Sequence, residues 1–151
     1  MVDFFQQKGL AELKRIDQQE IWYQDWLDYQ AKHGLYAGLL TPAAYSTQGG
    51  HLDLRRLVRF VEAFGYFSPA HAYNLHVTFL GLCPILMSDN EPLKREAIAT
   101  LEAGGVFAFG VSEKGHGSDL LGNEFAVRPV KEGERVADGS KYYIGNANSA
   151  A

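Results

Sequence analysis

The chain has 151 residues, of which 46% are hydrophobic and 13% aromatic, a composition typical of a folded globular protein and not of a disordered one. A net charge of −4, with no run of lysine or arginine, excludes a surface built to bind nucleic acid. The most apolar stretch, residues 77–87, is too short for a membrane span, so we expect a soluble cytoplasmic protein. Its single cysteine, Cys83, lies among apolar residues and is expected to be reduced and buried.

The first half of the chain is expected to be helical. Apolar residues at helical spacing predict one helix or two over residues 10–33, ended by Gly34. The glycine- and proline-containing stretch 34–50 predicts a loop wrapped over the helices. Asp53 is placed to cap a further helix that ends near Gly65. That helix is expected to bury one apolar stripe, formed by Leu54, Leu57, Val58, Val61 and Phe64.

Two more helices are predicted before residue 105. Ser68-Pro69 supplies a cap and a first-turn proline for a helix that is apolar on most sides over residues 73–87 and is therefore expected to be central. Pro84 should kink or divide it. Asp89 or Asn90 opens the last helix, and Gly104 closes it. Four helical regions with short links indicate a bundle.

After Gly105 the pattern changes from helix to strand. Strands are predicted at residues 106–111, 125–130 and 141–144, with turn signals at 132–133 and 138–139. The predicted fold class is therefore mainly α, an amino-terminal helical bundle (residues 1–105) followed by the first strands of an incomplete antiparallel β domain (residues 106–151). Three short strands bury little and leave an unpaired edge, so we expect the chain to stop partway through that domain.

The densest cluster of glycine and polar residues is GVSEKGHGSD at residues 110–119, directly after a predicted strand. Glycines let the backbone approach a ligand closely, and consecutive amides with two serine hydroxyls can donate to its oxygens and ring nitrogens. The spacing matches no phosphate-binding loop, dinucleotide fingerprint or nucleophile elbow. A solvated connecting loop is the alternative that the residues alone leave open.

No metal site is expected. His71 and His76 are five positions apart, so on a helix they point in different directions. Capping or packing is the expected role of both histidines.

Two motifs in order resemble the amino-terminal part of the acyl-CoA dehydrogenases. That family has a strand leading into Ser/Thr-Glu-x-x-x-Gly-Ser-Asp, and later an aromatic-Ile-Thr-Asn segment after a Gly-x-Lys turn. Here they are Ser112-Glu113 with Gly117-Ser118-Asp119, and Gly139-Ser140-Lys141 with Tyr143-Ile144-Gly145-Asn146. The upstream helices agree with the family's helical first domain, so the resemblance covers nearly the whole chain.

The resemblance implies an FAD-dependent oxidoreductase of fatty acid metabolism that removes two hydrogens from an acyl-CoA thioester, works with an electron acceptor and forms a homo-oligomer. Ser118 would also meet the substrate. No catalytic residue is expected here, because the family's base lies in a carboxy-terminal domain. We therefore expect this polypeptide alone to be inactive and to bind FAD weakly or not at all. The residues implied to bind FAD are Phe109, Gly110, Val111, Ser112, Glu113, Gly117, Ser118, Tyr143, Ile144 and Gly145.

Two positions depart from the family pattern. Lys114 stands where a proline is usual, and Gly145 stands where threonine or serine supplies a hydroxyl near the flavin N5. These departures leave open a flavin-dependent monooxygenase or a nitroalkane oxidase on the same scaffold. A non-enzymatic helical interaction module, with the glycine loop only a connector, is the alternative from another class.

Overall fold

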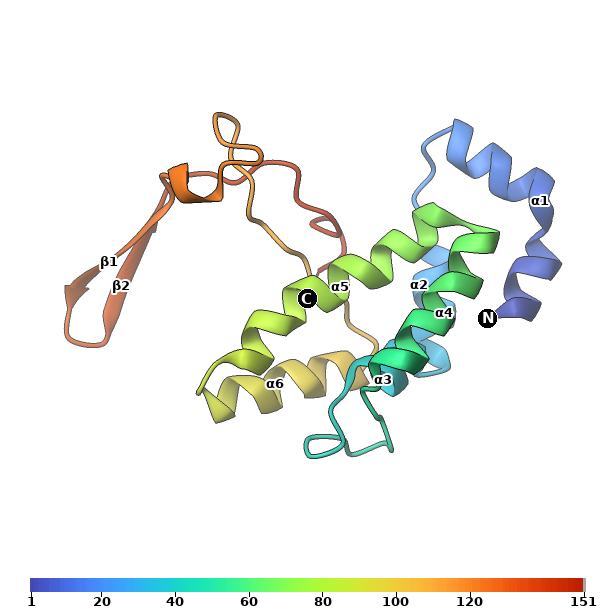
Figure 1. Ribbon diagram of the computed structural model, residues 1–151, viewed down its shortest axis with the longest axis horizontal. Coiled ribbons are helices and arrows are strands. Elements are labelled where there is room, and N and C mark those ends of the chain that lie inside the picture. Colours follow the sequence, from blue (N-terminus) through green and yellow to red (C-terminus); the bar gives the residue numbers. More distant parts are fainter. Residues whose placement is uncertain (151) are drawn as a thin grey trace.

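A computed structural model describes residues 1–150, which form a helical body with a β hairpin projecting from one end (Figure 1). The prediction of a mainly α chain, with helices first and antiparallel strands after, is confirmed. The helices are α1 (Val2–Gln18), α2 (Gln24–Lys32), α3 (Leu35–Leu40), α4 (Leu54–Phe67), α5 (Pro69–Met87) and α6 (Glu91–Glu102). A short 3₁₀ turn, η1 (Leu120–Gly122), precedes strands β1 (Ala126–Lys131) and β2 (Glu134–Asp138).

Three helices begin at the predicted capping residues. The Asp53 side chain accepts hydrogen bonds from the first amides of α4, and the Ser68 hydroxyl accepts one from the amide of His71 in α5. Asn90, one of the two candidates, caps α6 through the amide of Leu93. Each cap satisfies an amide that has no partner inside its helix, so the helix start is encoded by a few adjacent residues.

The predicted loop at residues 34–50 is wrong in its first part, because residues 35–40 form α3. Gly34 takes a left-handed φ of 57° and directs the chain from α2 into this helix. Tyr36 and Leu40 are completely buried there, against α2, α4 and α6. Tertiary burial therefore stabilises a helix that is too short to form by itself. α1 also begins earlier than predicted, at Val2, and bends at Gly9.

Helix α4 buries a narrower stripe than predicted and runs past Gly65 to Phe67. Leu57 and Phe64 are buried, whereas Leu54 and Val58 are 63% and 66% exposed and Val61 is also exposed. α4 lies at the surface and packs mainly on α5, so only the line of residues facing α5 loses contact with water.

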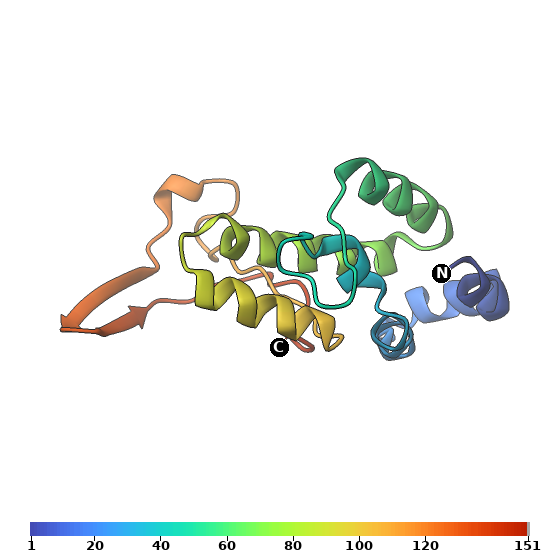
Figure 2. The ribbon, with the colours of Figure 1, turned by 90° about the horizontal axis from the view of Figure 1, so that it is seen from below.

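Helix α5 is central, as predicted, and Figure 2 shows it lying along α6 in the middle of the molecule, with the hairpin and α1 at opposite ends. It continues through Pro84 without dividing. Pro84 is exposed, so water can reach the carbonyl whose helical hydrogen bond is lost. Cys83 beside it is only half-buried, and this partial burial raises the pKa of its thiol.

The strand predictions are partly wrong. The predicted strand 125–130 is found as β1, but residues 106–111 and 141–144 form no strand. An unpredicted strand, β2 (Glu134–Asp138), lies between the two turn signals. Gly133, with φ of 77°, turns the chain straight back, so β1 pairs with the residues that follow at once. Nearly every residue of the resulting hairpin is exposed.

Candidate functional site

Two segments far apart in sequence lie side by side on α5. Phe109 forms an antiparallel bridge with Gly145, and the amide of Tyr142 donates a hydrogen bond of 2.8 Å to the carbonyl of Ser112. Ile144 packs over Gly110, where a Cβ would lie 3.4 Å from the Ile144 Cδ1 atom. The structure therefore brings the predicted residues 109–112 next to the predicted residues 143–145 (Figure 1).

Two glycines let these segments approach α5 closely. A Cβ on Gly81 of α5 would lie 2.4 Å from the carbonyl oxygen of Ala108. A Cβ on Gly145 would lie 2.8 Å from the Cγ2 atom of Val77. Real Cβ atoms do not approach other atoms so closely, so the two contacts require glycine at both positions.

Asn146 anchors the second segment to the helical body. It is 4% exposed and has a left-handed φ of 62°, which asparagine tolerates well. Its Nδ2 donates to the carbonyls of Asn74 and Phe107, both at 3.0 Å. Its Oδ1 accepts a 2.8 Å hydrogen bond from the Asn74 side chain. One buried amide thus joins α5, the second segment and Phe107, two residues before the first segment.

The same network continues into the core. The Trp26 indole donates to the Tyr36 hydroxyl, which donates to Asn74 Oδ1, each at 2.8 Å. Sequence reasoning did not select Asn146 as a site residue, and its only signal was its place at the end of the second motif. Residues fully inside a protein need every polar group paired, so this chain fixes the relative position of all its members.

Glu113 joins the glycine-rich loop at residues 110–119 to the chain that follows it. Its carboxylate accepts hydrogen bonds of 2.8 Å from the amides of Glu124 and Phe125 and one of 2.9 Å from Lys141 Nζ. The amide of Glu124 and the Lys141 cation are the main reasons that the pKa of Glu113 falls to about 2. Lys141 also donates to the carbonyl of Val111 at 2.9 Å. In this structure the carboxylate is therefore committed to holding the loop.

Replacing Glu113 with glutamine should loosen this junction, because a neutral amide cannot accept three hydrogen bonds as strongly as a carboxylate. We expect the amides of Glu124 and Phe125 to exchange with deuterium roughly tenfold faster. Glu132→Gln, in the exposed turn of the hairpin, is the matched control.

The effect of Glu113 should depend on pH with a definite sign. Because its pKa is lowered from 4.5 to about 2, its contribution is complete above pH 4.5 and disappears as the pH falls toward 2. Equal exchange in Glu113→Gln and wild type at pH 7 would contradict the assigned role.

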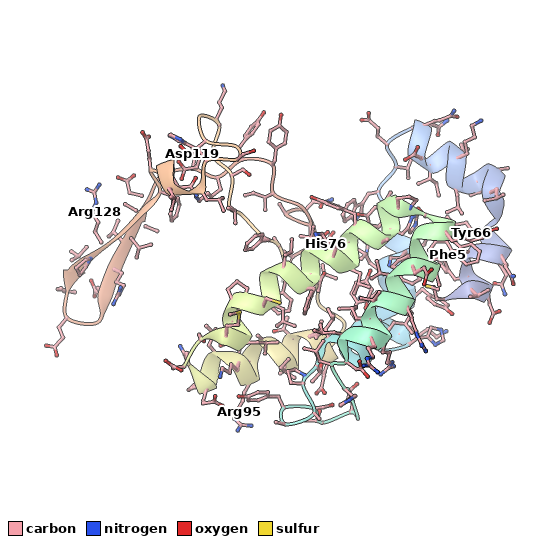
Figure 3. All side chains as sticks on the ribbon, in the orientation of Figure 1. Phe5, Tyr66, His76, Arg95, Asp119 and Arg128 are labelled. Carbon is pink, nitrogen blue, oxygen red and sulfur yellow. The ribbon has the colours of Figure 1, made fainter. Side chains whose placement is uncertain are left out.

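The tip of the loop lies apart from the paired segments. Glu113 and His116 bond to each other through both backbone groups and close a tight turn. Asp119 then caps η1 by accepting a hydrogen bond from the amide of Gly122 (Figure 3). Gly117 and Ser118 between them are exposed, and no bond or bridge among residues 1–150 connects them with residues 143–145.

Comparison with solved structures shows which known fold this chain has. The chain matches butyryl-CoA dehydrogenase from Megasphaera elsdenii with a TM-score of 0.84 and 25% identity, over 98% of this chain and 39% of that chain. It has the fold of the amino-terminal part of an acyl-CoA dehydrogenase. An acyl-CoA dehydrogenase of Bacillus anthracis, solved with FAD, matches with a TM-score of 0.78 and 27% identity, over 98% of this chain and 25% of that chain.

A third structure comes from work on the electron transferring flavoprotein of Acidaminococcus fermentans and flavin-based electron bifurcation. It matches with a TM-score of 0.83 and 24% identity, over 98% of this chain and 38% of that chain. The chain thus spans a quarter to two fifths of the length of these structures. No protein-family model and no curated sequence matches it. The resemblance to the acyl-CoA dehydrogenases is confirmed.

The donors at the paired segments fit the flavin that acyl-CoA dehydrogenases carry. Within the described residues, the amides of Val111 and Ser112 and the Ser112 hydroxyl have no hydrogen-bond partner, whereas the Val111 carbonyl accepts from Lys141 and from Asn123. Free donors beside the glycine at position 110 suit a flat ring whose edge carries several acceptor atoms.

A hollow of the loop region lies away from the paired segments. It has a volume of about 520 Å³, and of the predicted site residues only Glu113 lines it. The other lining residues are Lys114, Gly115, His116, Glu124, Phe125, Asp138, Gly139 and Ser140.

Two other features bear on the site. Among residues 1–150 there is no group of three or more His, Cys, Asp or Glu placed to hold a metal, and no helix there is both long and apolar enough to cross a bilayer. His71 has the expected packing role, since it is buried and pairs with Ser68, whereas His76 is exposed on α5.

Proposed function

We propose that this chain forms the amino-terminal part of an FAD-dependent acyl-CoA dehydrogenase and supplies one wall of its flavin site. The observation that carries the proposal is the pairing of residues 109–112 with residues 143–145 on α5, through the bridge between Phe109 and Gly145. The second motif thereby lies beside the amides of Val111 and Ser112, which have no hydrogen-bond partner among the described residues. A loop that only connected two elements would have no need of this arrangement.

Bound FAD would accept the hydride that leaves the β carbon of an acyl-CoA thioester while a carboxylate outside this chain takes the α proton. The residues of this chain bind and orient. Val111 and Ser112 donate hydrogen bonds to the ring edge, and the backbone of Tyr143, Ile144 and Gly145 packs beside the ring. Ser118, on the exposed loop tip, is the residue proposed to meet the substrate.

The remaining features belong to the same proposal. Residues 1–105 would form the helical domain and residues 106–151 the start of a flavin-binding β domain, as the last helix ends at Glu102 and only short strands follow. The exposed valines of the hairpin, Val127, Val130 and Val136, are what a sheet would cover. We further propose that the whole protein forms a homo-oligomer and passes electrons to a separate acceptor. It would act in fatty acid metabolism, in the cytoplasm.

The test uses the full-length protein that carries residues 1–151. We expect it to purify with FAD absorbance and to form enoyl-CoA from acyl-CoA with an artificial electron acceptor. Ser112→Ala should weaken FAD binding about tenfold, which is the effect of losing one hydrogen bond worth about 1.4 kcal/mol. Ser140→Ala, an exposed serine of the hollow, should leave FAD binding unchanged.

Other outcomes separate the alternatives. Oxygen-dependent hydroxylation would favour the flavin monooxygenase, and a full-length protein without flavin would favour the interaction module. A titration of the 151-residue chain with FAD should show weak binding or none. Stoichiometric flavin on that chain would contradict the half-site that we propose.

A further inference from the structure

One face of α5 carries both segments of the candidate site. Residues 73, 77 and 81 are four apart, so they follow one another along a single helix face. Gly81 meets residues 107 and 108, while Tyr73 and Val77 meet Gly145. This face of α5 therefore contributes to the surroundings of both predicted flavin-binding segments.

Tyr73 is the polar residue on this face that lies closest to the second segment. Its hydroxyl oxygen would be 3.2 Å from a Cβ placed on Gly145. The side chain is 53% exposed, and its hydroxyl has no hydrogen-bond partner among residues 1–150. An exposed tyrosine hydroxyl beside a site that binds a heterocycle is available to donate to it.

Resting on the function proposed above, we propose that Tyr73 is a further flavin-binding residue, whose hydroxyl donates a hydrogen bond to the ring from α5. A side chain at position 145 would force Val77 to shift, because its Cβ would lie 2.8 Å from the Val77 Cγ2 atom. In this proposal the donor comes from the helix and not from the segment. Gly145, which departs from the family pattern, and Tyr73 lie next to each other.

The hydroxyl should act on the reduced ring more than on the oxidised ring. Reduction adds electrons to the ring, and a donor directed at it stabilises the added charge. Removing this donor should therefore lower the reduction potential while leaving most of the binding contacts in place.

The experiment compares Tyr73→Phe with wild type in the flavin-loaded full-length protein. We expect the equilibrium between reduced and oxidised flavin to shift about tenfold toward the oxidised form, a potential about 30 mV lower for a two-electron couple. FAD affinity should change less than threefold. Tyr66→Phe is the matched control, since Tyr66 is 84% exposed on α4, and Figure 3 shows it at the end of the helical body away from the hairpin.

The outcomes distinguish this inference from the proposed function. A full-length wild-type protein that holds no flavin would overturn both. A flavin-loaded wild type whose potential equals that of Tyr73→Phe would overturn the role of Tyr73 alone. A lower melting temperature of Tyr73→Phe with an unchanged potential would assign the hydroxyl to structure, and this would also overturn it.

Discussion

Replacing Asn146 with alanine is expected to lower the free energy of unfolding of the 151-residue chain by about 3 to 4 kcal/mol. The substitution leaves the carbonyl of Phe107 and the side chain of Asn74 without the partners that Asn146 gives them. Both are at the junction of α5 with the site, where Asn74 is completely buried. Burying polar groups without partners costs far more than a hydrogen bond contributes when it is made.

Urea denaturation measures the loss, and hydrogen exchange locates it. Exchange of the Tyr142 amide, which bonds to Ser112, should accelerate because residues 141–150 come away from α5. Asn146→Gly keeps the left-handed backbone and removes only the side chain, so it should be nearly as destabilised. Asn148→Ala, an exposed asparagine two residues on, is the control. A change below about 0.5 kcal/mol in Asn146→Ala would contradict the anchoring role.

The second large effect is a loss of stability in mild acid, which we assign to His71. Its ring is 2% exposed, among Phe5, Tyr23 and Trp26. Burial, reinforced by the Lys8 cation, lowers the pKa of His71 from 6.5 to about 4. Between these values the unfolded chain binds a proton that the folded chain does not. The contribution of His71 to stability is therefore complete above pH 6.5 and falls as the pH drops toward 4.

The expected loss across this range is about 3 kcal/mol at most. Urea denaturation at several pH values measures it. Above pH 4.5 Glu113 does not interfere, because its contribution disappears only below that value. In His71→Phe the slope between pH 6.5 and 4 should flatten, whereas His76→Asn, an exposed histidine on the same helix, should keep it. An unchanged slope in His71→Phe would show that other groups cause the acid sensitivity.

The accuracy of the sequence predictions varied with the range of the interactions involved. Asp53, Ser68 and Asn90 were correctly placed at helix starts, because a cap bonds to amides two or three residues away. The wrong assignments at residues 35–40 and in the apolar stripe of α4 have one cause. Each depends on which surface is covered by a distant helix, and the neighbouring residues in the sequence do not indicate which surface that is.

The candidate site shows the same division. The two motifs were sufficient to predict that residues 109–112 and 143–145 belong together, and the resemblance they carry is confirmed as a fold. They gave no sign that α5 is the surface on which both segments lie. They gave no sign of Asn146 or Tyr73 either, because the residues that these two contact are about 70 positions away.

The sequence by itself determined the order of helices and strands, the helix starts and the two motifs, since periodicity, caps and turns act over a few residues. Only the tertiary structure decided that α3 is a helix and that Gly81 and Gly145 let two distant segments lie against α5. These features depend on burial and close contact between residues far apart in the chain. Such contacts stabilise the structure only once the chain has folded.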